Sequence, residues 1–518
     1  MATTASAERL QSSARVGRSE PFRPHTSRSW LWLLVAAGLL LFANGANSVW
    51  VAAWLAPIFL LRFVRTQKTL VGLPIAYVLL SATMAFQFRG MVPIPGIAYY
   101  GFLVVDGLTL VAPYVLDRVL APRIGGFAAT LIFPAAWAAT DYLVSLGMYG
   151  SWGASAYSQY GNLALLQLLS VTGLWGVTFL MGWFAACCNG LWEEGVQSSR
   201  ARRGLGLCCG VILAVILLGG IRTSFLAPSS PTVRIASLSK RNVGQRASDA
   251  AWGHLLTNQA SDKELDEIRG EGNAVDNDLL ARAGQEAQAG AKIVFWGEGN
   301  APVFKEDEPA LFARGRELAA KYRIYLGMGM ATWNRGQARP LENKLVLITP
   351  DGQVAWEYLK ARPVPGGEAA LSVRTDGRLR SLDTPYGRMS AVICFDGDFP
   401  GLLAQAGVLG ADILLDPSND WRAIDPWHTQ MASFRAIEQG FNLVRHTSHG
   451  LSAAFDYQGR RLSAMDHYQT GDYVLISEVP TKGVRTIYGR LRDWFAWLCL
   501  ALVAALALRA ARPSHRAM

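Results

Sequence analysis

Long apolar runs constrain the fold of this chain more than any other feature of its sequence. Residues 29–227 and 493–509 are almost continuously apolar, whereas residues 228–490 have the mixed composition of a soluble domain. A helix that crosses a bilayer needs about 20 mainly apolar residues. We therefore predict a multi-pass α-helical membrane region joined to a separate soluble domain. The predicted spans are residues 29–45, 48–64, 70–88, 96–116, 125–146, 164–190, 204–226 and 493–509.

Basic residues lie in the N-terminal tail, in alternate connections between these spans and in the C-terminal tail, with Arg89 the main exception. Because Lys and Arg gather in cytoplasmic loops, eight spans place both termini in the cytoplasm and residues 228–490 outside. The net charge of +10 then reflects membrane topology and does not predict nucleic-acid binding. The basic positions are Arg9, Arg15, Arg18, Arg23, Arg28, Arg62, Arg65, Lys68, Arg118, Arg123, Arg200, Arg202, Arg203, Arg509, Arg512 and Arg516.

These patterns divide the chain into four predicted parts. Residues 1–28 form a basic cytoplasmic tail, and residues 29–227 form a seven-helix transmembrane region. Residues 228–490 form the outside domain, and residues 491–518 contain the last span and a second basic tail. An alternative in which a signal peptide is cleaved near residues 43–46 is disfavoured, because the basic leader is long and further spans follow at once.

Apolar strand-like runs alternate with helical stretches between residues 228 and 490. Tight turns such as residues 350–352 join some of the strands into hairpins. Strands separated by helices predict an α/β domain, with a mixed sheet covered by helices. The predicted helices include residues 262–289, 308–322, 399–408 and 427–439.

Cys394 is the only cysteine of the outside domain, and a predicted strand over residues 389–396 contains it. The other five cysteines, Cys187, Cys188, Cys208, Cys209 and Cys499, fall in predicted spans. An internal disulfide is therefore excluded for the outside domain. A single thiol in an oxidising compartment usually has a chemical role.

Two further ionisable residues, Glu298 and Lys360, follow apolar runs in the same way as Cys394. Neighbouring strand ends in one sheet bring such groups together. A cysteine is mostly protonated at neutral pH and needs a base, which a partly buried Glu298 can supply. Lys360 and the backbone N–H after Cys394 could stabilise an oxyanion, so the three side chains predict acyl-transfer chemistry.

Two other interpretations of the polar residues remain open. A Cys–His dyad has candidates in His254, His428, His446, His449 and His467, none at a diagnostic spacing from Cys394. The pair His446 and His449 permits a metal site, but no cysteine or acidic ligand stands beside it.

The connection at residues 148–160 is dense in aromatic and small polar residues and lacks charge. It fits either an aromatic belt at the membrane interface or a surface that faces the outside domain.

The order Glu298, Lys360, Cys394 resembles the Glu-Lys-Cys triad of the nitrilase, or carbon–nitrogen hydrolase, superfamily. Residues 359–368 (LKARPVPGGE) are similar to its lysine motif, and residues 393–400 (ICFDGDFP) to its nucleophile motif. Residues 157–180 and 486–495 are similar to the membrane-bound branch of that superfamily, the apolipoprotein N-acyltransferase family. The segment between Lys360 and Cys394 is shorter than in that branch.

The resemblance implies a nitrilase-like αββα sandwich outside the inner membrane of a bacterium, with the catalytic domain in the periplasm. Cys394 is expected to accept an acyl chain from a phospholipid as a thioester and to pass it to the α-amine of a diacylglyceryl-cysteine apolipoprotein, a ping-pong reaction. Glu298 is the expected base and Lys360 the expected oxyanion stabiliser, with Glu368, Phe395 and Asp396 in supporting positions. Such chemistry needs no metal and no soluble cofactor.

Two alternatives belong to other functional classes. A membrane-tethered amidase or nitrilase would hydrolyse a small amide, and the short segment before Cys394 fits that activity. A non-catalytic nitrilase-like scaffold is the other alternative, although all three triad residues are retained. We also expect Trp421, Trp427 and Phe304 to flank a lipid entrance, because these bulky side chains lie in predicted loops near the motifs.

Overall fold

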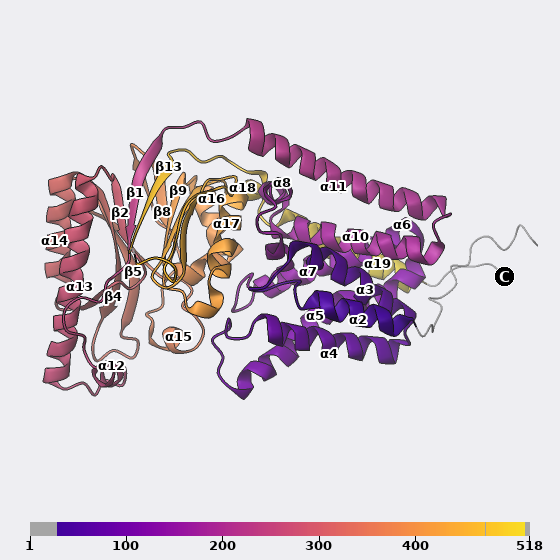
Figure 1. Cartoon of the computed structure of the whole chain (residues 1–518), viewed down its shortest axis with the longest axis horizontal. Coiled ribbons are helices and arrows are strands. Elements are labelled where there is room, and N and C mark those ends of the chain that lie inside the picture. Colours follow the sequence, from indigo (N-terminus) through magenta and orange to yellow (C-terminus); the bar gives the residue numbers. More distant parts are fainter. Residues whose placement is uncertain (1–27, 472, 513–518) are drawn as a thin grey trace, which may run out of the picture.

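The computed structural model describes residues 28–471 and 473–512, so most of the two predicted basic tails lies outside the described residues. Apolar helices form one half of the molecule and a two-sheet sandwich forms the other (Figure 1). The helical half contains α2 (Ser29–Leu40), α3 (Trp50–Thr66), α4 (Thr69–Gln87), α5 (Ile97–Ile124), α6 (Gly126–Ala129), α7 (Ile132–Ser145), η1 (Ser155–Gln159), α8 (Leu163–Leu166), α9 (Leu169–Thr172), α10 (Leu174–Glu194), α11 (Ser199–Phe225), α18 (Ile487–Leu491) and α19 (Trp494–Ala511).

Five segments of the described chain are long and apolar enough to cross a membrane: α4, Gly126–Ser145, α10, α11 and α19. Helix α2 has 12 residues, α3 has 17, and the 28-residue α5 carries four charged side chains. The predicted span 164–190 is not one helix, because α9 ends at Thr172 and α10 begins at Leu174, with Gly173 between them. Gly173 has φ +66°, and a side chain there would collide with Tyr488.

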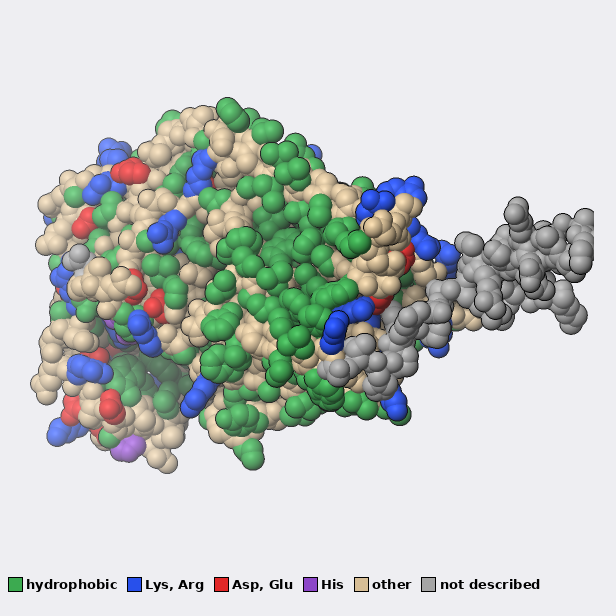
Figure 2. All heavy atoms as spheres, turned by 45° about the vertical axis from the view of Figure 1, so that its right-hand side comes forward, with side chains coloured by type: hydrophobic (Ala, Val, Ile, Leu, Met, Phe, Trp, Pro, Cys, Tyr) green, Lys and Arg blue, Asp and Glu red, His purple; other side chains and the backbone are tan. Residues whose placement is uncertain are grey.

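Apolar side chains cover the outer surface of the helical half in a broad band (Figure 2). Leu70 and Ile97 are 90% and 88% exposed, which a soluble surface would not favour. Arg65, at the end of α3, bonds Asp117 near the end of α5 and pairs with Glu193 at the end of α10. The ends of these three helices therefore lie together, at the end of the bundle away from the sandwich (Figures 1 and 2).

Two sheets lie face to face in the other half. The first has the order β13-β1-β2-β4-β5-β6, with β3 paired to β4, and the second has the order β12-β11-β10-β9-β8-β7. Their strands are β1 (Thr232–Leu238), β2 (Ile293–Trp296), β3 (Ala301–Phe304), β4 (Tyr325–Trp333), β5 (Leu341–Ile348), β6 (Val354–Leu359), β7 (Ser381–Thr384), β8 (Gly387–Ala391), β9 (Ile413–Ser418), β10 (Asn442–Thr447), β11 (Leu451–Phe455), β12 (Arg461–Asp466) and β13 (Val474–Pro480).

Helices cover the outer face of each sheet, which gives an αββα sandwich. The helices of this half are α12 (Asp249–Leu256), α13 (Asp262–Gln288), α14 (Glu308–Tyr322), α15 (Gly367–Leu371), α16 (Pro400–Leu409) and α17 (Trp427–Gln439). Helices α13 and α14 cover the first sheet on the outside of the molecule, and α16 and α17 cover the second sheet on the side of the helical half (Figure 1). The predicted αββα fold is therefore confirmed.

The two halves share an apolar core. Trp427, Met431 and Phe434 of α17 pack with Trp175 and Leu169 of the helical half, while other α17 residues pack on the second sheet. Helix α17 is therefore buried on both faces. This packing joins the second sheet to the apolar helices through α17.

Candidate active site

Glu298 and Lys360 form an ion pair at one edge of the first sheet. Glu298 lies just beyond β2 and Lys360 just beyond β6, and Lys360 Nζ is 2.7 Å from Glu298 Oε1. Glu368, on α15, lies 2.9 Å from the same Nζ. Asn343 of β5 donates from Nδ2 to Glu298 Oε1 at 2.7 Å and to Glu368 Oε1 at 2.9 Å. Two carboxylates therefore share one ammonium and one amide.

Burial controls the proton affinity of this group. Desolvation raises the pKa of Glu298, the Glu368 carboxylate raises it further, and Lys360 and Asn343 only partly oppose the rise. Desolvation lowers the pKa of Lys360, but the negative charges around it outweigh that effect and hold the pKa well above its usual range. Lys360 is therefore cationic, and Glu298 is a stronger base than an exposed carboxylate.

Cys394 lies at a sharp turn directly beyond β8. The predicted strand 389–396 is too long, because β8 ends at Ala391 and residues Cys394–Asp398 form a 3₁₀ turn, η2. Cys394 has φ +53°, a left-handed conformation that costs a non-glycine residue energy. Its backbone N–H donates to Asp416 Oδ1 at 2.8 Å, which fixes the start of the turn.

Cys394 is 3% exposed, and both carboxylates and cations lie near its thiol. Burial, together with the nearby Glu298 carboxylate, holds the pKa of the Cys394 thiol well above its usual range, against the effects of Lys360 and Arg445. A thiol in this state keeps its proton until a base removes it. The arrangement can therefore carry out base-assisted nucleophilic attack, with a fixed cation beside the reacting atoms.

The predicted supporting residues have different surroundings. Phe395 lines a cavity beside Cys394 and packs edge-on against Phe399. The Asp396 carboxylate instead points into the fold, where it accepts hydrogen bonds from the Ile393 N–H at 3.0 Å and the Arg362 N–H at 2.7 Å. Asp396 therefore holds the turn together.

A buried charge network behind Cys394 was not predicted from the sequence. Arg445 of β10 donates to Asp416 at 2.6 Å and to Asp420 at 2.9 Å, and Asp420 lies 2.7 Å from His428 Nδ1. Asp398 and Asp420 raise the pKa of His428 to about 9, although burial and Arg445 oppose the rise. No local pattern marks these residues, because their partners come from separate strands and helices.

Cys394, Asp420 and His428 place potential ligand atoms within 4.8 Å of one another. Asp420 and His428 already bind each other and Arg445, which leaves this group poorly suited to a metal. The predicted alternative at His446 and His449 is not supported. His446 lies 2.7 Å from the Ser239 hydroxyl, and His449 lies 2.7 Å from Asn419 Oδ1, so the two rings have separate partners.

Comparison with known proteins agrees with both halves of the structure. Residues 243–488 match the carbon-nitrogen hydrolase family, and residues 36–187 match the N-terminal domain of apolipoprotein N-acyltransferase. A relative named apolipoprotein N-acyltransferase from Geobacter metallireducens is 27% identical over 421 residues, covering 76% of each chain. One with the same name from Bradyrhizobium diazoefficiens is 28% identical over 391 residues, covering 69% of each chain. The chain is therefore similar to apolipoprotein N-acyltransferases in both of its halves.

Solved structures are similar to about half of this chain. A crystal structure of an amidase from Nesterenkonia sp. is 18% identical, with a TM-score of 0.39, and the match covers 53% of this chain and 98% of the amidase.

An apolar cavity lies beside Cys394. Cys394, Phe395, Val364 and His428 contribute one side of it, and Trp421 and Ile424 contribute another. The remaining wall comes from the helical half, through Met91, Val92, Pro93, Tyr149 and Trp152. The thiol therefore borders a cavity that the two halves build together.

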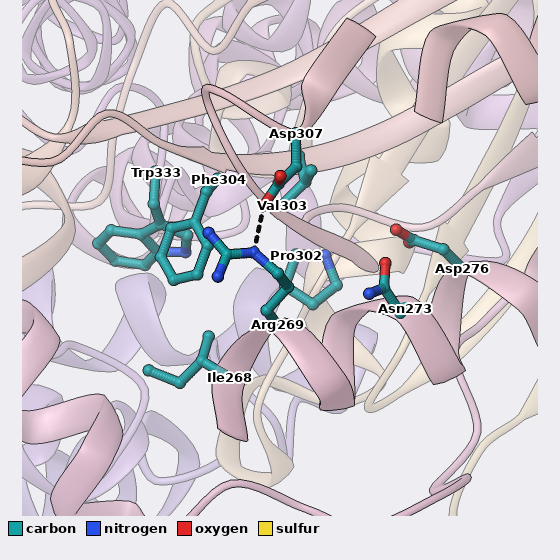
Figure 3. Close-up of a pocket in the computed structure, with 9 residues that line it drawn as sticks. All are labelled: Ile268, Arg269, Asn273, Asp276, Pro302, Val303, Phe304, Asp307 and Trp333. Carbon is teal, nitrogen blue, oxygen red and sulfur yellow. Dashed lines mark hydrogen bonds and ion pairs between the residues drawn. The ribbon is translucent and has the colours of Figure 1, made fainter. Parts of the chain in front are cut away.

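The predicted lipid-entrance residues separate in the structure. Trp421 lines the cavity beside Cys394, whereas Trp427 is 2% exposed and packs in the core between the halves. Phe304 is wrong for this role, since it lies on β3 beside a different pocket (Figure 3). There the Arg269 guanidinium lies over the Phe304 ring and donates to Asp307 at 2.7 Å.

The aromatic connection at residues 148–160 faces the sandwich and not only the membrane interface. Ser151 and Tyr157 are both buried in it and join a hydrogen-bond chain that reaches Asp398 and Arg435. Trp152 packs edge-on against the His428 ring, with centroids 5.5 Å apart. Of the two interpretations of this connection, the structure supports the surface that faces the outside domain.

Proposed function

We propose that this protein transfers an acyl chain from a phospholipid, through a thioester on Cys394, to the α-amine of a diacylglyceryl-cysteine apolipoprotein. The observation that carries the proposal is the position of Cys394. Its thiol lies between a buried acid–base group and an apolar cavity with a wall from the helical half. An apolar cavity suits a lipid chain, and a soluble amide would not require it.

In the first half-reaction, Glu298 takes the thiol proton as Sγ attacks the ester carbonyl of the phospholipid. Lys360, together with the Phe395 N–H, stabilises the oxyanion of the tetrahedral intermediate. The C–O bond then breaks, and protonated Glu298 returns its proton to the departing lysophospholipid oxygen. The product is an acyl thioester on Cys394.

In the second half-reaction, the neutral α-amine of the apolipoprotein attacks the thioester carbonyl. Glu298 takes a proton from the new amide nitrogen, the C–S bond breaks, and Glu298 protonates the departing Cys394 sulfur. Lys360 again stabilises the oxyanion, and Glu368 holds Lys360 in place through its 2.9 Å ion pair. No metal or soluble cofactor enters either step.

We further propose that the protein lies in the bacterial inner membrane with residues 228–490 as a periplasmic catalytic domain. The basic ends of α3 and α5 lie together and away from the sandwich, with Arg118 Nη1 donating to the Arg65 carbonyl at 3.2 Å, which supports cytoplasmic termini under the positive-inside rule. An impermeant amine-reactive reagent applied to intact spheroplasts should label lysines of residues 228–490. Labelling only after membrane lysis would contradict this orientation.

The membrane-tethered amidase is the weaker alternative, because the family match extends through residues 36–187 of the helical half. The deciding experiment is mass spectrometry of lipoprotein N-termini from cells that lack this protein. We expect the amide-linked third chain to be lost, restored by the wild type and by Cys209→Ser, and not by Cys394→Ser. Cys209 is an exposed cysteine of α11, so it controls for thiol loss in general. Restoration by Cys394→Ser would refute the thioester, and unchanged lipoproteins after deletion would refute the function.

A further inference from the structure

The turn that carries Cys394 is held from two directions. From inside the sandwich, the Asp396 carboxylate and Asp416 bind the backbone at the start of the turn. The end of the turn is held from the helical half. The backbone carbonyl of Asp398 accepts hydrogen bonds from both the N–H and the hydroxyl of Ser151, each at 2.7 Å.

Ser151 is the last link of a directed hydrogen-bond chain. Arg435 donates from Nη2 to the Tyr157 hydroxyl at 2.7 Å, and the Tyr157 hydroxyl lies 2.7 Å from Ser151 Oγ. Because Ser151 Oγ donates to the Asp398 carbonyl, Tyr157 must be the donor to Ser151. The three side chains are at most 2% exposed, so each bond lies in a low-dielectric environment where such chains reinforce one another.

The connection at residues 148–160, which contains Ser151 and Tyr157, is also anchored to the helical bundle. The Ser155 N–H and the Thr178 hydroxyl both donate to Asp141 Oδ2, at 3.2 and 3.1 Å. Gly150 has φ +58°, and a side chain there would collide with the Asp398 carbonyl. Gly150 therefore allows this connection to approach Asp398 closely, and Asp141 fixes the connection to the helical bundle.

A strained residue keeps its conformation only where its surroundings determine it. Cys394 has φ +53°, and the loop bonds lie four residues further along the same turn. The Asp398 side chain also reaches His428 Nε2, at 3.3 Å, so a shift of Asp398 would also move the His428 ring, which lies near the thiol.

We propose that Ser151 and Tyr157, in the connection at residues 148–160, are positioning residues. They hold the Cys394 turn in its reactive conformation through the Asp398 carbonyl. The helical half then contributes to the geometry of the nucleophile and does not only anchor the domain. The kinetic part of this inference rests on the proposed acyl transfer, whereas its structural part does not.

The test compares Ser151→Ala and Tyr157→Phe with the wild type in the full-length protein reconstituted in lipid nanodiscs. Thioester formation on Cys394 from a labelled phospholipid should show a kcat lowered about tenfold, with KM changed less than twofold. Backbone hydrogen exchange of the peptide covering residues 394–400 should rise about tenfold. The double variant should lose little more than either single variant, because both changes break one chain.

Ser145→Ala is the matched control, because the Ser145 hydroxyl is also buried but donates only to the Tyr142 carbonyl of its own helix. Ser145→Ala should leave kcat and the exchange rate unchanged. Ser151→Thr keeps a hydroxyl at position 151, so it should have nearly the kcat and exchange rate of the wild type. Unchanged kcat and exchange in both test variants would overturn the proposal, as would a raised KM at constant kcat. If the wild type forms no thioester but Ser151→Ala still raises the exchange rate, the proposed function is refuted. The structural role of Ser151 and Tyr157 at the Cys394 turn is then still supported.

Discussion

Asn343→Asp is the most informative single substitution in the acid–base group. It replaces an amide with a carboxylate of nearly the same shape, at a position 2.7 Å from Glu298 and 2.9 Å from Glu368. The native group holds two carboxylates and one ammonium, and the variant would hold three carboxylates around the same Lys360. The added negative charge should raise the already raised pKa of Glu298.

The size of the effect follows from Coulomb's law. Two unit charges about 4 Å apart interact by about 4 kcal/mol at an effective dielectric constant of about 20. One pKa unit corresponds to about 1.4 kcal/mol, so the pKa of Glu298 should rise by about 2–3 units. Because the reaction needs the deprotonated carboxylate, the rate at neutral pH should fall by up to about 100-fold and recover as the pH increases.

The assay is single-turnover formation of hydroxylamine-sensitive acyl-Cys394 from a labelled phospholipid, measured from pH 5 to pH 10. Asn343→Leu is the matched control, since it removes the amide donors without adding charge. Asn343→Leu should lower the rate, but it should shift the acidic limb of the pH–rate profile less than Asn343→Asp does. Equal midpoints for the two variants, or full activity of Asn343→Asp at neutral pH, would refute Glu298 as the base in this charge environment.

Three further predictions address stability and the cavity. Arg445→Met should cost about 3–5 kcal/mol of unfolding free energy, seen as a lower Tm, because two carboxylates lose their buried partner. The unfolding free energy of the wild type should fall by about 3 kcal/mol between pH 6.5 and about pH 9, as His428 loses its proton. Denaturation curves of His428→Gln should not show this pH dependence. Trp421→Gln should slow thioester formation about tenfold and leave the rate of Cys394 alkylation by iodoacetamide unchanged. An equal decrease in both rates would contradict a role of Trp421 in lipid entry.

Local patterns were sufficient to predict the residues at strand ends. Glu298 and Lys360 each follow an apolar run, and a sheet brings such ends together whatever its exact strand order. The αββα fold was predicted from family resemblance, since alternation alone indicates only a mixed sheet covered by helices. Strands β3, β7 and β12 were missed, because they are short and their sequences carry proline or several polar residues.

The contacts that complete the site could not be predicted, because they join distant parts of the chain. Asn343 looks like an ordinary polar residue within a strand, and its role appears only when β5 lies between the strands that carry Glu298 and Lys360. Ser151 and Asp398 are 247 positions apart, and no periodicity relates them. The left-handed Cys394 is similarly invisible in the sequence, since the apolar run continues past the end of β8.

The pairing of β1 with β13 has a consequence for how the protein is made. These strands are the first and last of the sandwich, and they align from Thr232 with Pro480 to Leu238 with Val474. A ribosome must therefore synthesise nearly the whole domain before β1 gains its second neighbour. Until then one edge of the first sheet stays open, and a nascent chain stalled before β13 should be an unfinished substrate for chaperones and proteases.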